Sequence, residues 1–166
     1  MAKQSHFFFS LYTCVRLRYM QISKNLPQFE GENVLLVVTG KQEADFFRGG
    51  NGEIEKIAGF KVEKPFYDDR KGRVIRRGHG QVFSSGAVYE QQKEKILQDF
   101  RREFRKALRD VLQNQPDTVY IFTPSYLKND VLALFPKRLA HLVKKTISAN
   151  VYGRHPFEIL ERIRVR

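Results

Sequence analysis

The sequence is poor in the residues that build covalently linked or metal-stabilised folds. Cys14 is the only cysteine, so the chain has no disulfide framework and no thiolate metal site, and a reducing cytoplasmic setting fits. The four histidines, His6, His79, His141 and His155, show no spacing typical of metal ligands on one element. We therefore expect no metal and no cofactor.

No long hydrophobic run is present either. The apolar stretch Phe7–Val15 (FFFSLYTCV) is far shorter than the roughly 20 residues that a transmembrane helix needs. It resembles a secretion signal only loosely, because Arg16 and Arg18 follow it and no small-residue cleavage site does. The sequence therefore predicts no membrane partner.

Acidic residues are missing from three long stretches, of which the first is residues 1–29. This stretch has four basic residues, Lys3, Arg16, Arg18 and Lys24. It fits an organelle-targeting peptide, a basic arm, or an extension upstream of a second start at Met20, and these alternatives stay open. We predict a basic N-terminal extension over residues 1–30 and a single domain over residues 31–166.

The second acid-free stretch is residues 70–81, RKGRVIRRGHGQ, with five basic residues and three glycines. Only Val74 and Ile75 could be buried, so we predict an exposed loop over residues 69–86. The basic residues are Arg70, Lys71, Arg73, Arg76 and Arg77. The chain has a net charge of +12, whereas residues 30–69 carry −4. Positive charge concentrated in this way favours a polyanionic partner, first of all nucleic acid.

The whole chain, 166 residues of which 42% are hydrophobic, has the length and composition of one globular domain. Asn33–Thr39 (NVLLVVT) is a β-branched run that predicts a buried strand. Ala44–Arg48 and Glu53–Ile57 predict two more strands, joined by a turn at Gly49–Gly52. These three strands form an antiparallel meander with one solvated face.

The second half alternates helices and strands. Apolar residues at helical spacing predict a long helix over residues 87–114. Five of its basic residues crowd one part of the helix, either as RNA contacts or as an ordinary solvated face: Arg101, Arg102, Arg105, Lys106 and Arg109. Later elements are a strand (Thr118–Thr123), a short helix from Ser125, a helical segment near Arg138–Val143, a strand (Lys144–Ala149) and a helix (Pro156–Arg164). We predict an α/β fold in which a mixed five-stranded sheet, a three-strand meander followed by β-α-β units, is flanked by helices.

The order of these elements and several local strings resemble a known family. The strings are VLLVVTGKQEADFFRGGNGEIEKI, TVYIFTPSYL and KKTISANVYGRHPFEILERI. They resemble the catalytic middle domain of archaeo-eukaryotic class-1 peptide-release factors, in particular its stand-alone bacterial relatives, often labelled host-attachment proteins. The resemblance covers residues 31–166 and implies an RNase H-like sheet.

The family has a Gly-Gly-Gln motif just before its long helix, and the matching position here is His79-Gly80-Gln81. The resemblance implies that Gly80 and Gln81 act in hydrolysis of the peptidyl-tRNA ester, with Gln81 placing a water and the basic residues of the loop contacting ribosomal RNA. His79 departs from the motif, because its Cβ restricts the backbone. No counterpart of the codon-reading and partner-binding domains is present.

Three interpretations of function follow. The first is a ribosome-associated, RNA-binding factor of the release, rescue or dormancy type. It acts at the peptidyl-transferase centre without codon recognition, and its partners are the ribosome, ribosomal RNA, the tRNA acceptor end and, in one variant, a translation-factor protein. The second is a peptidyl-tRNA hydrolase that uses the His79-Gly80-Gln81 loop.

The third interpretation is a metal-dependent nuclease, which is disfavoured. Such enzymes need carboxylates that converge from adjacent strands. The first predicted strand has no acid, and Asp45, Glu53 and Glu55 belong to a hairpin with apolar neighbours. A surface-adhesion role is disfavoured too, because the sequence has no convincing secretion signal and no disulfides.

Overall fold

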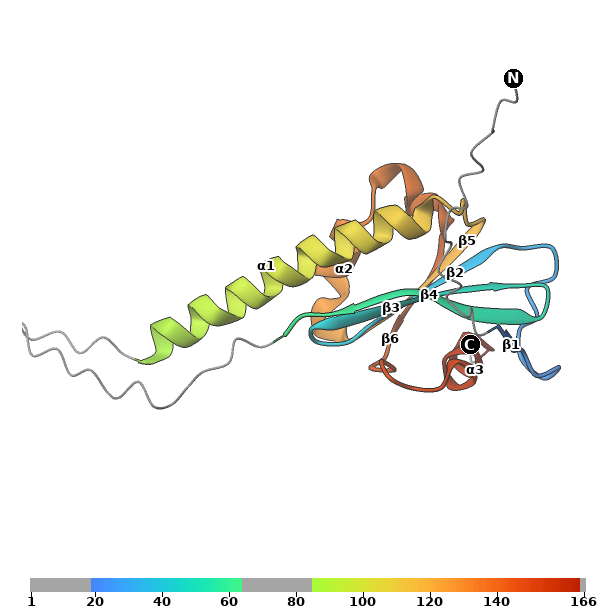
Figure 1. Cartoon of the computed structure of the whole chain (residues 1–166), viewed down its shortest axis with the longest axis horizontal. Helices are drawn as coiled ribbons and strands as arrows, with labels where there is room; N and C mark the ends of the chain where they lie inside the picture. Colours follow the sequence, from blue (N-terminus) through green and yellow to red (C-terminus); the bar gives the residue numbers. More distant parts are fainter. Residues whose placement is uncertain (1–18, 64–84, 165–166) are drawn as a thin grey trace, which may run out of the picture.

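The computed structural model describes residues 19–63 and 85–164, which form one mixed sheet with helices on both faces (Figure 1). The strands are β1 (Met20–Gln21), β2 (Val34–Thr39), β3 (Glu43–Gly50), β4 (Glu53–Lys61), β5 (Thr118–Thr123) and β6 (Val143–Ser148). The helices are α1 (Ser85–Leu112), α2 (Lys128–Leu134) and α3 (Pro156–Arg164), with 3₁₀ turns η1 (Ser125–Leu127) and η2 (Lys137–Leu142).

The sheet has the order β1-β4-β3-β2-β5-β6 and confirms the predicted fold class. Strands β2, β3 and β4 form the antiparallel meander, while β5 pairs parallel to β2 and β6 parallel to β5. Without β1, the strands lie side by side in the order β4, β3, β2, β5 and β6. The two strands of the β-α-β part, β5 and β6, therefore extend the sheet beside β2, the first strand of the meander. The predicted loop over residues 69–86 ends earlier than expected, because Ser85 and Gly86 already belong to α1.

The count of five strands is wrong, because β1 adds a sixth. Met20 and Gln21 pair antiparallel with Ile54 and Glu53 of β4. Ile22 is only 4% exposed, and Leu26 and Phe29 pack on the same core. This part of the predicted N-terminal extension therefore belongs to the sheet. A two-residue strand has no periodicity to read, which is why the sequence did not indicate it.

The hairpin between β3 and β4 turns more tightly than expected. Asn51 (φ 50°) and Gly52 (φ 80°) are both left-handed, as a two-residue type I′ turn requires. Gly49 and Gly50 belong to β3 instead of the turn. A Cβ at Gly50 would lie 3.0 Å from the backbone oxygen of Glu32, so glycine is needed there for close approach.

Helices lie on both faces of the sheet, so the expected solvated face of the meander is largely buried. It persists in β4, where Lys56, Gly59 and Lys61 are exposed on the α3 side. All six residues of β2 are buried, as expected for a strand between two cores. Leu35 and Val37 face α1 and α2, where they pack with Phe100 and Phe104. The alternate residues face α3, where Ile159 and Leu160 complete the second core. A helix on each face thus fixes which residues of each strand reach the surface.

Helix α1 packs on the sheet through one face. Among its residues 93–112, whose side chains the structure describes, the buried ones are Phe100, Phe104, Leu108 and Val111, which recur every three or four positions. Its 28 residues span about 42 Å at about 1.5 Å per residue. Figure 1 shows the first half projecting beyond the sheet. Within the described residues, no helix has the length and apolar content that crossing a bilayer requires.

Candidate nucleic-acid interface

The residues predicted to carry out the chemistry, His79, Gly80 and Gln81, lie outside the described residues. The predicted RNA contacts lie outside them too: Arg70, Lys71, Arg73, Arg76 and Arg77. The structure places the elements on either side of this segment, β4 ending at Lys61 and α1 beginning at Ser85. The candidate interface that the described residues offer is therefore the outer side of α1.

Five basic side chains form what we call the basic face of α1. They are Arg101, Arg102, Arg105, Lys106 and Arg109. Because Phe100, Phe104 and Leu108 point into the core, the positions after them on the helix turn outward. Residues 98–109 contain these five cations and two acidic residues, so their net charge is +3. They line a shallow groove of about 500 Å³ with Gln98.

Two of the five cations are neutralised by neighbours. Arg101 Nη2 lies 2.7 Å from Asp130 Oδ1 and so ties α1 to α2. Arg102 lies 2.9 Å from Asp99 and 3.2 Å from Glu103. The hydrogen bond with Glu103, and then the charge of Asp99, raise the pKa of the exposed Arg102 guanidinium above its ordinary value. Both charges are therefore matched within the protein.

The other three cations have no such match. Arg105, Lys106 and Arg109 are exposed, and no carboxylate in the described part of the chain forms an ion pair with them. Arg105 and Arg109 lie one turn apart, and like charges at this spacing destabilise a helix by about 0.2–0.5 kcal/mol. Packing gives no reason for this arrangement, so it fits the binding of anions from outside.

Beside the basic face, a hollow of about 290 Å³ opens between α1 and the end of α2. We call it the α1–α2 hollow. Its lining is Arg105, Leu108, Arg109, Leu112, Leu134 and Pro136. Leu108 and Leu134 are buried, whereas both arginines are exposed and no acid contributes. The hollow therefore combines an apolar floor with a cationic rim. The sequence did not indicate it, because it forms only where two helices pack.

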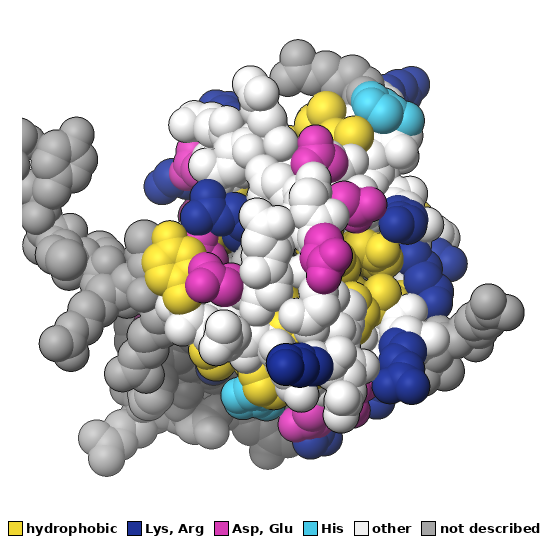
Figure 2. Space-filling model, turned by 90° about the vertical axis from the view of Figure 1, so that its right-hand side faces the viewer, with side chains coloured by type: hydrophobic (Ala, Val, Ile, Leu, Met, Phe, Trp, Pro, Cys, Tyr) yellow, Lys and Arg dark blue, Asp and Glu magenta, His cyan; other side chains and the backbone are white. Residues whose placement is uncertain are grey.

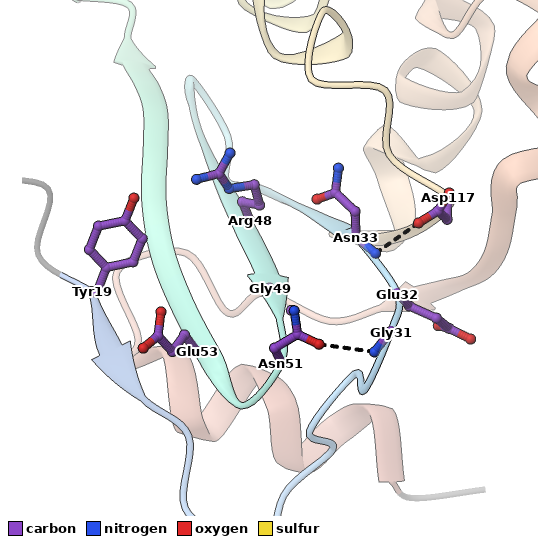
Figure 3. A pocket seen from close by; sticks show the side chains of 10 residues that line it. Tyr19, Gly31, Glu32, Asn33, Arg48, Gly49, Asn51, Glu53 and Asp117 are labelled. Atoms are coloured by element: carbon purple, nitrogen blue, oxygen red, sulfur yellow. Dashed lines mark hydrogen bonds between the residues drawn. The ribbon is translucent and has the colours of Figure 1, made fainter.

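The β3–β4 hairpin has the reverse charge. A hollow of about 380 Å³ at the β3–β4 hairpin, the hairpin-end hollow, is lined by Glu32, Glu53 and Asp117 (Figure 3). Figure 2 views the molecule from this end and shows acidic side chains near the middle of the face. Arg48 is the one cation in the lining. This end does not suit phosphate groups.

Hydrogen bonds hold the walls of the hairpin-end hollow. The backbone N–H of Asn33 donates to Asp117 Oδ2 at 2.9 Å and joins β2 to the segment before β5. The N–H of Gly31 donates to Asn51 Oδ1 at 3.0 Å (Figure 3). The acids of this end are therefore held on a rigid frame, part of which Asp117 itself provides.

The carboxylates that a nuclease would need do not converge. Asp45 lies on the α3 side of the sheet and pairs with Lys56 at 2.6 Å. Glu55 lies on the α1 side, is only 2% exposed and forms an ion pair with Arg48. In residues 19–63 and 85–164, no three or more His, Cys, Asp or Glu side chains form a group that could hold a metal ion.

Comparison of the sequence with known protein families and with curated proteins finds no match. Among solved structures, the chain is similar to a crystal structure of the archaeal translation termination factor aRF1. The two are 11% identical with a TM-score of 0.42, and the match covers 69% of this chain and 29% of that one. The match thus spans less than a third of the archaeal factor. A likeness this weak does not establish a function.

Proposed function

We propose that the protein is an RNA-binding factor of translation that holds ribosomal RNA on the basic face of α1. One observation carries the proposal: Arg105, Lys106 and Arg109 are exposed on one helix, and no carboxylate among the described residues pairs with them. RNA is the polyanion that suits such a surface, because its phosphates release condensed counterions when they meet lysine and arginine.

The translation part of the proposal rests on the resemblance of the sequence to release factors. Residues 70–81 add five cations immediately before α1 in the sequence. We infer that the basic face and this segment contact the same RNA. We further propose that the factor acts without codon recognition, in rescue or in dormancy.

A second candidate function is hydrolysis of the peptidyl-tRNA ester. It is favoured by Gly80 and Gln81, which match the family motif and lie four to five positions before the first residue of α1. In this proposal Gln81 orients the attacking water, and the basic residues beside it hold the RNA. Because His79 replaces the first glycine of the motif, we prefer the first candidate function, in which the protein occupies the ribosome without hydrolysis.

The test is co-sedimentation with ribosomes at several salt concentrations. We expect the wild type to sediment with ribosomes. Replacing Arg105, Lys106 and Arg109 together by alanine should reduce the slope of log affinity against log salt concentration by about two to three phosphate contacts. Arg162→Ala on α3, where acids and bases balance, is the matched control and keeps full binding. A wild type that fails to sediment at low salt excludes the proposal.

A release assay on stalled complexes separates the two candidate functions. Release by the wild type that is lost in Gln81→Ala, while ribosome binding persists, establishes the hydrolase. Binding by both proteins without release establishes the occupying factor.

A further inference from the structure

We propose that the α1–α2 hollow binds one unpaired nucleotide, so that this surface selects single-stranded over duplex RNA. The inference rests on the proposed function and makes it more specific. The base lies on the apolar floor, and the adjoining phosphates contact Arg105 and Arg109.

The chemistry of the lining points to a ligand with two parts, one anionic and the other flat or apolar. Leu108, Leu112, Leu134 and Pro136 offer only apolar atoms from their side chains. Arg105 and Arg109 offer planar guanidinium groups, which both pair with phosphates and stack on bases. A free inorganic anion uses the rim alone and leaves the floor wet, so it does not account for the whole site.

The position of the hollow favours a nucleotide that belongs to a strand. Lys106 lies next to Arg105 on the basic face, and the groove lined by Arg102, Lys106 and Arg109 adjoins the hollow because Arg105 and Arg109 line both. A strand whose phosphates follow the groove can turn one base inward. Proteins that bind single strands combine a cationic groove with surfaces on which bases stack.

Duplex RNA fits this site poorly. Its bases are paired and stacked, so none reaches the apolar floor without being unstacked. The phosphates of a duplex still reach the exposed cations of the basic face. The hollow should therefore add affinity for single strands only, while the basic face serves both forms.

The structure holds the hollow open from two sides. Arg101 bridges α1 to Asp130 of α2 at 2.7 Å. In the core beneath, the rings of Phe104 and Phe135 meet edge to face with centroids 6.1 Å apart. Two contacts of different kinds therefore fix the spacing of the two helices.

The experiment measures binding of a fluorescently labelled 12-nucleotide RNA and of the duplex of the same sequence. Leu112→Ala truncates the floor and Leu132→Ala is the matched control, because Leu132 is an exposed leucine of α2 outside the hollow. We expect Leu112→Ala to weaken single-strand binding about fivefold and to leave duplex binding and the salt slope unchanged. Lys106→Ala weakens both forms alike. Thermal melting of each variant shows whether it is folded.

A second measurement reads the position of the base directly. We expect 4-thiouridine in the single strand to crosslink on irradiation to peptides that contain Leu112 or Leu134–Pro136. Equal effects of Leu112→Ala on both RNA forms, or crosslinks only elsewhere, overturn the proposal while RNA binding itself stands. If an acidic peptide of glutamate and leucine binds in place of RNA, the hollow is a protein-docking groove. If the wild type binds neither RNA form, the proposed function fails as well.

Discussion

Two hollows in the described part of this molecule are similar in size and opposite in charge. The α1–α2 hollow encloses about 290 Å³ under two exposed arginines, and the hairpin-end hollow about 380 Å³ among three acids. Concavity alone therefore says little about the ligand, whereas the sign of the lining charge does. Because the positive and negative linings lie on different parts of the surface, a polyanion is attracted to one orientation of the protein and repelled from another.

The largest expected effect comes from reversing the charge of the α1–α2 hollow. Arg105→Glu with Arg109→Glu should weaken RNA binding about a hundredfold near 0.1 M salt, because two attractive contacts become repulsive. Both side chains are exposed, so the melting temperature should change little. Fluorescence anisotropy with labelled RNA measures the change. An unchanged affinity would show that the positive charge of the α1–α2 hollow has no part in RNA binding.

Arg48 sharpens the comparison, because it is the cation of the hairpin-end hollow. Removing it in Arg48→Ala leaves the carboxyl group of Glu55, which is only 2% exposed, without its ion-pair partner. We expect a loss of about 2–3 kcal/mol in the free energy of unfolding, below the full cost of a buried pair because Arg48 is partly exposed. Urea denaturation measures it, and RNA affinity should not change.

The matched control for Arg48→Ala removes both partners. The pair Arg48→Met with Glu55→Leu replaces the two charges by apolar groups and should recover most of the lost stability. If the double variant is as unstable as Arg48→Ala, the deficit comes from lost packing and not from the uncompensated carboxylate.

The smallest expected effect comes from making the hairpin-end hollow basic. Glu32→Lys with Glu53→Lys changes the local charge by four and should strengthen RNA binding about threefold, because it only removes repulsion and adds no built site. The gain should vanish at high salt. A gain that persists there would indicate a specific contact at this end.

The sequence predicts the frame of this fold from strong local patterns. The predicted strands Asn33–Thr39 and Thr118–Thr123 and the predicted helix over residues 87–114 each lie within a residue or two of the observed element. Glu55 shows the limit: its alternation with Ile54 and Ile57 suggested a solvated face. The structure buries it, because Arg48 on the neighbouring strand supplies a partner that the pattern of one strand does not reveal.

The candidate site divides in the same way. The basic residues of α1 were visible in the sequence, but which of them are paired depends on Asp130 in another helix as well as on neighbours such as Asp99. The α1–α2 hollow joins Arg105 to Pro136 across two elements, so no local spacing indicates it. His79, Gly80 and Gln81 remain predictions.

The pairing of β2 with β5 has a consequence for folding. Asn33 and Asp117, joined at 2.9 Å beside these strands, are 84 positions apart in the sequence. Pairing β2 with β5 at the centre of the sheet therefore encloses a long chain segment. Contacts between residues this far apart in the sequence reduce the folding rate more than they reduce the stability of the folded state. The entropy of closure grows only logarithmically, by about 0.6 kcal/mol for each doubling of length. Doubling the length of chain enclosed between Asn33 and Asp117 would therefore cost the sheet only about that much free energy.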